Sequence, residues 1–301
     1  MSNSPSAPLP DILCIGAVLW DVIGRADAPL GLGADVPGRI SRVPGGVALN
    51  IAATLARLGM RPALLSHIGR DAAGQDLMAA CHRLGLVTGH IYRSSDLPTD
   101  LYMAIEGTNG LIAAIADAHS LEAADERILR PLLDGRLGSS KTPWPGLIAL
   151  DGNLTAALLA RIAGHPAFAR ADLRLAPASP GKAQRLAPLL AHPRATLYLN
   201  LAEAAVLCHS DLPDTAAAAA ALLARGARRV LVTDGSNPVA EGSAAGLLVR
   251  TPPAVSVTRI TGAGDTFLAA HIAADRAGAN PSQALDIALR AAAAYVSGGS
   301  S

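Results

Sequence analysis

The sequence has few cysteines and no excess of charge of either sign. Its 301 residues include only three cysteines, and this odd, widely spaced set argues against both a disulfide framework and a metal site. We therefore expect Cys14, Cys81 and Cys208 to be buried core thiols. Lys and Arg number 25 against 24 Asp and Glu. Such a balance gives no electrostatic argument for nucleic acid or a membrane surface as a partner.

Targeting and membrane-spanning patterns are also missing. Residues 1–10 have neither the basic nor the apolar region of a signal peptide, so we expect a flexible leader there. The longest alanine-rich stretch, which begins at Thr215, is interrupted by Arg225 and Gly226 well short of a membrane span. The expected location is the cytoplasm.

Several common catalytic patterns do not occur. No GxGxxG follows the first apolar run, which disfavours a dinucleotide-binding dehydrogenase, and no Gly-Lys-Ser/Thr completes a Walker A loop. No GxSxG turn supports acyl transfer. The eight histidines are scattered without the spacing of transition-metal ligands.

What the sequence does contain is an alternation of short apolar runs with amphipathic helical segments. Half of the residues are apolar, enough for a large core. The segment 45–59 places apolar residues at helical spacing and ends at Gly59, a residue suited to a left-handed C-terminal cap. Strands that alternate with helices predict an α/β fold with a mostly parallel central sheet and helices on both faces. The strands are expected near 11–18, 62–69, 147–155, 172–182, 195–200 and 228–235.

One region has a different texture. Two β-rich runs flank "GTNG" at 107–110, and Asn-Gly between such runs is a strong hairpin signal. A hairpin within a βαβ chain indicates an inserted lid. We therefore predict one α/β domain over 11–301, with a small β-lid from about 17–44 and 91–119.

The stretch "RITGAGDTF" at 259–267 has two interpretations. Gly262 and Gly264 allow close approach of the backbone to a ligand, and a helix starting at about Asp265 would offer unpaired N–H groups to an anion. Asp265 could then face a substrate hydroxyl. The alternative is that Asp265 simply caps the helix. Spacing alone does not decide between them.

Two further polar turns fall where strands are expected to end. Asn200 and Glu203 in "NLAE" could hold a hydrated Mg²⁺ through oxygen ligands, although an ordinary capping box explains the same pattern. Asp21 and Asn50 stand near paired glycines and could bind sugar hydroxyls, while Asn50 could equally be a solvated first-turn residue. Ligands collect at this edge of such sheets.

Together, and in this order, the motifs resemble the ribokinase-like (PfkB) family of sugar and nucleoside kinases. The resemblance covers nearly the whole chain, from Asp11 to about Val296. "GGVALNIAATLARLG" looks like the N-terminal signature of the family, "ITGAGDTFLAAH" like its C-terminal signature, and "NLAE" matches its N-x-x-E motif. "VTDG" at 232–235 corresponds to a strand end that touches the nucleotide phosphates.

The resemblance implies an ATP-dependent phosphotransferase that uses Mg²⁺ and has an alcohol as acceptor. It makes Asp265 the catalytic base and assigns other roles to the matching positions. These are an anion hole at Gly262, Ala263 and Gly264; Mg²⁺ organised by Asn200 and Glu203; nucleotide contacts at Asn200, Thr233 and Gly235; and substrate contacts at Asp21, Gly45, Gly46 and Asn50. The β-lid is expected to form a homodimer contact, as it often does in the family.

Within the family, the sequence looks most like pseudouridine kinases. "GGVALN", "LIAAIADAHSLE", "LDGNLT" and "PASPGK" each resemble segments of that subgroup. The same likeness places Asp117 and Lys182 near the substrate or lid. Pseudouridine is thus the expected substrate. The alternatives are another sugar or nucleoside kinase of this fold, of the ribose, adenosine or fructose type, and a non-catalytic sugar- or nucleotide-binding protein.

One departure from the family pattern stands at Arg259. Many members have an acid there that helps to bind K⁺. A guanidinium at this position could act as a tethered cation, so we expect K⁺ to be dispensable.

Overall fold

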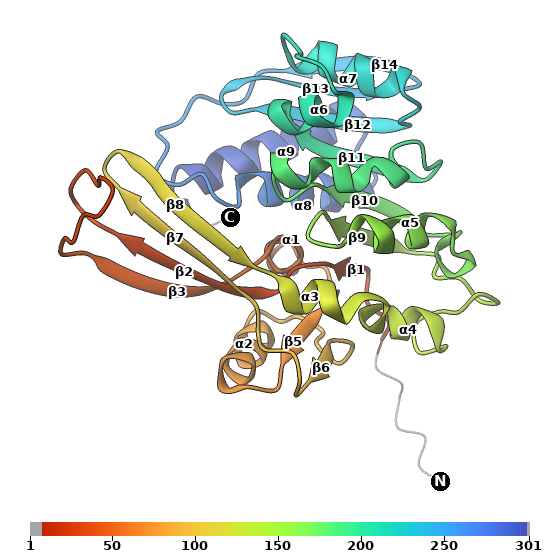
Figure 1. The fold of residues 1–301 in the computed structure, drawn as a ribbon. Helices are drawn as coiled ribbons and strands as arrows, with labels where there is room; N and C mark the ends of the chain where they lie inside the picture. Colours follow the sequence, from red (N-terminus) through yellow and green to blue (C-terminus); the bar gives the residue numbers. More distant parts are fainter. Residues whose placement is uncertain (1–7, 300–301) are drawn as a thin grey trace.

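The computed structural model describes residues 8–299, so most of the leader expected at 1–10, and the last two residues of the domain, lie outside the described residues. A central sheet of eight strands runs through the body of the molecule in the order β14-β13-β12-β11-β10-β9-β1-β4 (Figure 1). The six strands from β12 to β4 are parallel, and the edge hairpin β13–β14 is antiparallel. The strands are β1 (Ile12–Ile15), β4 (Pro62–Leu65), β9 (Leu147–Asp151), β10 (Asp172–Ala176), β11 (Ala195–Asn200), β12 (Arg229–Asp234), β13 (Asn237–Ser243) and β14 (Gly246–Arg250).

Helices cover both faces of this sheet, as the sequence predicts. In β1, Leu13 and Ile15 belong to one buried cluster and Ile12 and Cys14 to the other, because successive side chains of a strand point to opposite faces. The first cluster is closed by α3 (His119–Ala124), α4 (Arg130–Leu133), α5 (Ala156–Gly164), α6 (Leu201–Cys208) and α7 (Thr215–Ala224). The second is closed by α1 (Val47–Arg57), α2 (Ala72–Arg83), α8 (Ala263–Arg276) and α9 (Pro281–Val296). Short 3₁₀ turns lie at Asp125–Leu129, Pro166–Phe168 and Pro180–Leu189.

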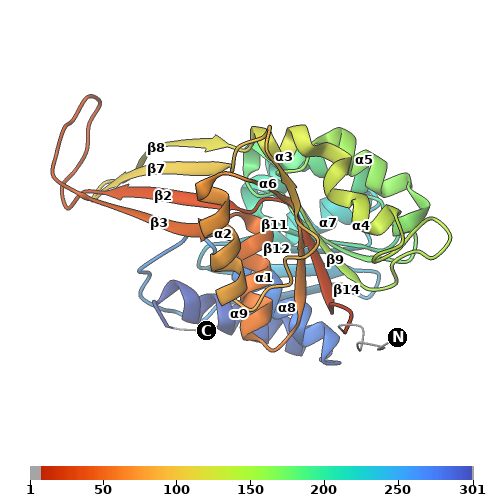
Figure 2. The same ribbon diagram turned by 90° about the horizontal axis from the view of Figure 1, so that it is seen from below.

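A second sheet extends from one side of the body in both views (Figures 1 and 2). It has the order β3-β2-β7-β8, with β2 (Leu19–Arg25), β3 (Arg39–Gly45), β7 (Leu101–Gly107) and β8 (Gly110–Asp117). We call these four strands the lid sheet. The predicted hairpin is confirmed, since β7 and β8 pair antiparallel across Gly107 and Gly110. A third, two-stranded sheet joins β5 (His67–Gly69) and β6 (Tyr92–Ser94).

The structure confirms the predicted glycine cap and the buried cysteines, and it contains three elements that the sequence patterns missed. Gly59 has φ of 84°, as expected of a left-handed residue after a helix, and the three cysteines are buried and free. The sequence patterns did not identify β13 and β14 or the long helix α9. No helix within residues 8–299 combines the length and the apolarity needed to cross a membrane.

Candidate active site

The first turn of α8 lies at the junction that the sequence marks as glycine-rich. The helix starts at Ala263, with Gly262 as the N-cap residue, so the expected start at Asp265 is wrong by two residues. Asp265 is therefore not the cap and occupies the third helical position. Gly262 has φ of 89°, and a Cβ on it would come within 2.6 Å of the Tyr295 hydroxyl. Only glycine fits this turn without displacing Tyr295.

Asp265 forms a hydrogen bond that connects distant parts of the chain. Asn50, on α1, donates from Nδ2 to Oδ2 of Asp265 at 2.9 Å, so the alternative of a purely solvated Asn50 is wrong. Burial raises the pKa of Asp265 to about 7, the Asn50 hydrogen bond opposes this rise, and the carboxylates of Asp151, Glu203 and Asp21 add to it. A carboxyl group with this pKa can accept a proton near neutral pH.

The amides of the first turn could bind an anion. The N–H of Ala263 donates to the Ile260 carbonyl at 3.0 Å. Within the part of the chain that the structure describes, the N–H groups of Gly262, Gly264 and Asp265 have no acceptor, as is normal at the start of a helix. In this conformation Gly262, Gly264 and Asp265 are better placed than Ala263 to offer amides to a phosphate.

Asp21 lies on β2 of the lid sheet, close to the point where β3 returns to the body. It is half-buried, and burial raises the pKa of Asp21 to about 6. A Cβ on Gly45, which pairs with Leu19 across the two strands, would overlap the Asp21 carboxylate. Gly46 is the N-cap residue of α1. The two glycines thus leave room for Asp21 beside the start of the helix that carries Asn50.

Asn200 and Glu203 form a complete capping box at the start of α6. Oδ1 of Asn200 accepts the Glu203 N–H, and Oε2 of Glu203 accepts the Asn200 N–H, both at 2.8 Å. The ordinary capping box, one of the two interpretations of "NLAE", is therefore present. Burial raises the pKa of the Glu203 carboxyl group. The box occupies one oxygen of each side chain. Binding of Mg²⁺ through water molecules on the remaining Glu203 oxygen fits this donor set.

The expected nucleotide contacts lie next to this box. Thr233, on β12, pairs with Asn200, on β11, in the parallel register. Its hydroxyl donates to the Leu199 carbonyl at 3.4 Å. Gly235, in the turn after β12, has φ of 56°. Among residues 8–299, no group of three or more His, Cys, Asp or Glu side chains has the arrangement of a metal cluster.

The two residues assigned only by subgroup likeness lie in different surroundings. Lys182 is half-buried and donates from Nζ to Oδ1 of Asn153 at 2.5 Å. Asp117 is exposed at the end of β8 and bonds His119 at 2.9 Å. Asp117 is thus part of the lid sheet, as the subgroup likeness implies, and its contact with a substrate stays a prediction.

Sequence reasoning missed a further carboxylate, Asp151, at the end of β9. It is completely buried, and its charge raises the pKa of Asp265. Desolvation raises the pKa of Asp151 itself, although backbone N–H groups oppose the rise. Its position at the carboxyl end of a parallel strand, the edge where ligands bind in such sheets, could have identified it.

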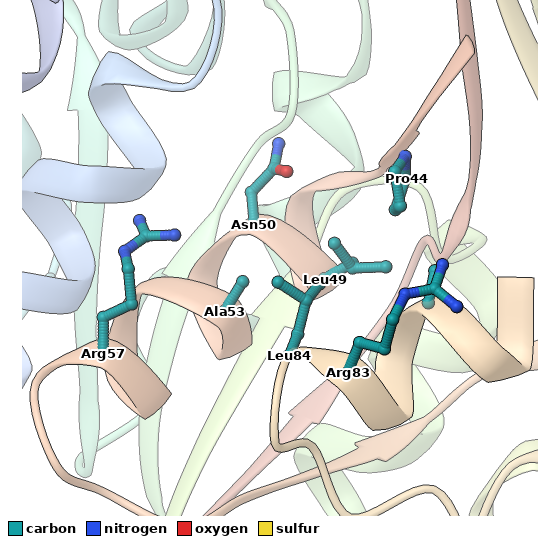
Figure 3. Close-up of a pocket in the computed structure, with 8 residues that line it drawn as sticks. Pro44, Leu49, Asn50, Ala53, Arg57, Arg83 and Leu84 are labelled. Carbon is teal, nitrogen blue, oxygen red and sulfur yellow. The ribbon is translucent and has the colours of Figure 1, made fainter. Parts of the chain in front are cut away.

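A groove of about 370 Å³ lies beside the site, between α1 and α2 (Figure 3). Asn50 is the only one of the predicted site residues that lines it. The other lining residues are Pro44, Leu49, Ala53, Arg57, Ala80, Arg83 and Leu84. The groove thus lies on the side of α1 that faces α2, and Asn50 connects it to Asp265.

The sequence pattern of the pfkB family carbohydrate kinases matches residues 9–301. The chain therefore belongs to this family. Its ribokinase-like fold agrees with this membership, and the class is that of ATP-dependent sugar and nucleoside kinases.

Individual relatives share about a third or less of their residues with this chain over the matched regions. The pseudouridine kinase of Escherichia coli (strain K12) is 28% identical over 263 residues, which cover 86% of this chain and 81% of that protein. The uncharacterized sugar kinase YeiI of the same organism is 34% identical over 146 residues, or 48% of this chain, and the match spans only 39% of that protein. A solved carbohydrate kinase from Agrobacterium tumefaciens has a TM-score of 0.77 and 27% identity, with 95% of this chain and 90% of that chain covered.

Proposed function

We propose that this protein transfers a phosphoryl group from ATP to pseudouridine and releases pseudouridine 5′-phosphate. The observation that carries the phosphotransferase chemistry is Asp265, held by Asn50 at the first turn of α8 beside free amides. The choice of pseudouridine is supported by the likeness to pseudouridine kinases at 28% identity. Another sugar or nucleoside of similar size remains the second candidate.

In the proposed reaction, Asp265 orients the acceptor hydroxyl and takes its proton. The transition state of phosphoryl transfer is loose, so positioning and charge neutralisation matter more than a strong base. The pKa of Asp265, about 7, nevertheless makes this carboxylate a better base than an ordinary aspartate. Gly264 and Asp265 offer amides to the transferring phosphoryl group. Thr233 and Gly235 lie beside Asn200 to receive the nucleotide phosphates.

The acceptor is held from the lid side. Asp21 accepts hydrogen bonds from sugar hydroxyls, and Asn50 contacts both the sugar and Asp265. A Mg²⁺ ion held near Asn200 and Glu203 would neutralise phosphate charge when bound. Lys182 is half-buried near Asp151 and supplies positive charge close to the acceptor end of the site.

A screen with ATP and Mg²⁺ over pseudouridine, uridine, adenosine, ribose and fructose tests the proposal. We expect pseudouridine to have the highest kcat/KM and the product to carry the phosphate on its 5′ oxygen. A higher kcat/KM for uridine or ribose would remove the substrate assignment and leave the kinase class intact. Turnover of none of the five, with nucleotide binding retained, would favour the binding-protein alternative.

Arg259 supports a second element of the proposal, independence from K⁺. Its Nε donates to the Tyr295 carbonyl at 2.8 Å, and its Nη2 to the Gly299 carbonyl at 3.4 Å. The guanidinium also lies 3.7 Å from the centre of the Tyr295 ring. Carbonyl oxygens are the ligands that a bound K⁺ would use. The same screen, run with and without K⁺, is expected to give equal rates. A strong activation by K⁺ would contradict this role of Arg259.

We also propose that the protein is a homodimer that buries the outer face of the lid sheet. The register places Ile40, Met103, Ile105 and Ile115 on the face opposite to Asp21. All four are exposed, Ile40 by 81% and Ile115 by 69%, and such a contiguous apolar patch is typical of an interface. We expect Ile115→Glu to shift the mass measured by light scattering from dimer to monomer. A monomeric wild type would contradict the proposal.

A further inference from the structure

Asp151 is the most completely buried carboxylate near the site, and the proposed chemistry uses it only through the effect of its charge on Asp265. Its side chain has no exposed surface. Oδ2 accepts the N–H of Ala17 at 2.9 Å and that of Ala48 at 3.1 Å, and Oδ1 accepts the N–H of Asn153 at 2.8 Å. A buried charge is costly unless such donors satisfy it, so this arrangement is a built feature of the fold.

Hydrogen bonds among Asp151, Ala17, Ala48 and Leu49 form a closed ring. The ring lies where the lid sheet joins the body of the molecule, a place that we call the root of the lid sheet. Ala17 lies in the corner between β1 and β2, and Ala48 is the second residue of α1. Asp151 binds the N–H groups of both, while the carbonyl of Ala17 accepts the N–H of Leu49 at 3.4 Å. The corner that leads into the lid sheet is therefore held directly against the start of the helix that carries Asn50.

This ring requires a carboxylate at position 151. An ionised carboxylate only accepts hydrogen bonds, whereas an amide would turn an NH₂ group toward one of the three N–H donors. The neighbouring chain also leaves no space for adjustment, because a Cβ on Gly16 would overlap the Asp151 carboxylate. The three N–H donors on one side and the backbone at Gly16 on the other thus determine the position of the carboxylate.

We propose that Asp151 is a positioning residue for the acceptor. By fixing the β1–β2 corner against α1, it sets the spacing between Asp21, on the lid sheet, and Asn50, which holds Asp265. The catalytic consequence rests on the proposed kinase function. Asp151 touches neither the acceptor nor the phosphate, and it acts through the two residues that do.

Asp100 fixes the other two strands of the lid sheet in a similar way. Its side chain accepts the N–H groups of Ser120 and Leu121 at 3.0 and 2.9 Å. Asp100 directly precedes β7, and α3 follows β8, so these bonds connect the start of β7 to the segment that leaves β8. Its carbonyl accepts the Trp20 N–H at 3.3 Å, which links this root to β2. Buried carboxylates therefore hold both places where the lid sheet joins the body.

Substitution of Asp151 separates positioning from general stability. In Asp151→Ala we expect the KM for pseudouridine to rise at least about tenfold and kcat to fall, because small displacements of positioning groups have large effects on rate. The KM for ATP should change much less. Asp151→Asn keeps one acceptor oxygen and should lie between Asp151→Ala and the wild type. A folded Asp151→Ala with unchanged constants for pseudouridine would overturn the proposal, as would equal changes in both KM values.

Asp214→Ala is the control. Asp214 caps α7 through the Ala217 N–H at 2.7 Å, and α7 packs on β12 and β13, away from the lid sheet. This variant should lose stability with no change in the KM for pseudouridine.

Hydrogen exchange of the wild type tests the anchor even if every Asp151 variant fails to fold. We expect the amides of Ala17 and Ala48 to exchange as slowly as those of β1, while amides in the outer part of the lid sheet exchange faster. Exchange of Ala17 and Ala48 at the rate of the outer lid sheet would overturn the proposal. This measurement needs no substrate. A failed substrate screen with protected anchor amides would therefore overturn the proposed function alone.

Discussion

Asp265→Asn is expected to lower kcat by about 10³-fold or more, within the range for loss of a general base that also orients the nucleophile. The amide is nearly isosteric and can still pair with Asn50, so the KM for the acceptor should change little. What is lost is the ability to accept the hydroxyl proton. Steady-state kinetics at saturating ATP, with acceptor binding measured by calorimetry, separate the two effects. A kcat within tenfold of the wild type would sink the assignment of Asp265.

The pH dependence gives this prediction a second readout. Burial raises the pKa of Asp265 to about 7, so wild-type kcat/KM should rise with pH up to about 7 and then level off. A carboxyl pKa raised in the folded state also lowers stability as the pH rises from the ordinary aspartate pKa of 3.8 to about 7, and the loss is complete above that pH. Asp265→Asn should therefore be more heat-stable than the wild type at about pH 8, and the difference should shrink as the pH falls below 7.

Asp211→Asn is the matched control for both measurements. Asp211 is exposed in the loop between α6 and α7. The same change of charge there should leave the rate, its pH profile and the melting temperature unchanged. If Asp211→Asn were stabilised at high pH as much as Asp265→Asn, the effect would come from net charge and not from the buried carboxyl group.

The sequence predicted the layers of this fold well because fully buried parallel strands appear as short apolar runs. β1, β4 and β9 are of this kind. The edge hairpin was harder to identify. β14 is largely exposed, and β13 contains Pro238. In an edge strand the backbone pairing of the neighbours determines the structure, and the hydrophobic pattern carries less information.

The site shows the same division between local and distant information. The capping box of Asn200 and Glu203 could be predicted from four residues, because its bonds are local. The bond between Asn50 and Asp265 spans 215 positions, and only the family resemblance placed the two residues together. The raised pKa of Asp265 was not foreseen. A helix N-terminus alone would favour the anion, whereas burial beside three other carboxylates outweighs that effect.

Asp151 illustrates what the sequence patterns could not give. In "LDGNLT" it looks like one polar residue of a turn. Its importance comes from Ala17 and Ala48, two residues whose side chains carry no chemical signal and whose backbone N–H groups it binds. Backbone donors are present at nearly every position, so their use at one position becomes visible only in the folded chain.

The end of α8 distant from Asp265 is tied to the sheet by partly buried ion pairs. Arg229, on β12, contacts Glu241 at 2.7 Å and Asp275 at 3.2 Å. Arg174 contacts Asp275 at 2.7 Å, and the Tyr198 hydroxyl bonds His271 at 2.8 Å. Asp275 and His271 both belong to α8. This network therefore fixes the helix whose first turn carries Asp265.

Arg229→Met is expected to destabilise the protein by about 3–5 kcal/mol, because it leaves the Glu241 carboxylate buried without its partner. Glu241 is only 4% exposed, and its other ionisable neighbour among residues 8–299, Nε2 of His271, lies 3.8 Å from Oε2, beyond hydrogen-bond distance. The midpoint of urea unfolding provides the measurement. The Arg229→Met, Glu241→Leu double variant should recover much of the loss, since no charge is then left buried by itself. A single variant as stable as the wild type would show that Glu241 does not need Arg229. A double variant no better than the single would show that packing, and not the unpaired charge, causes the loss.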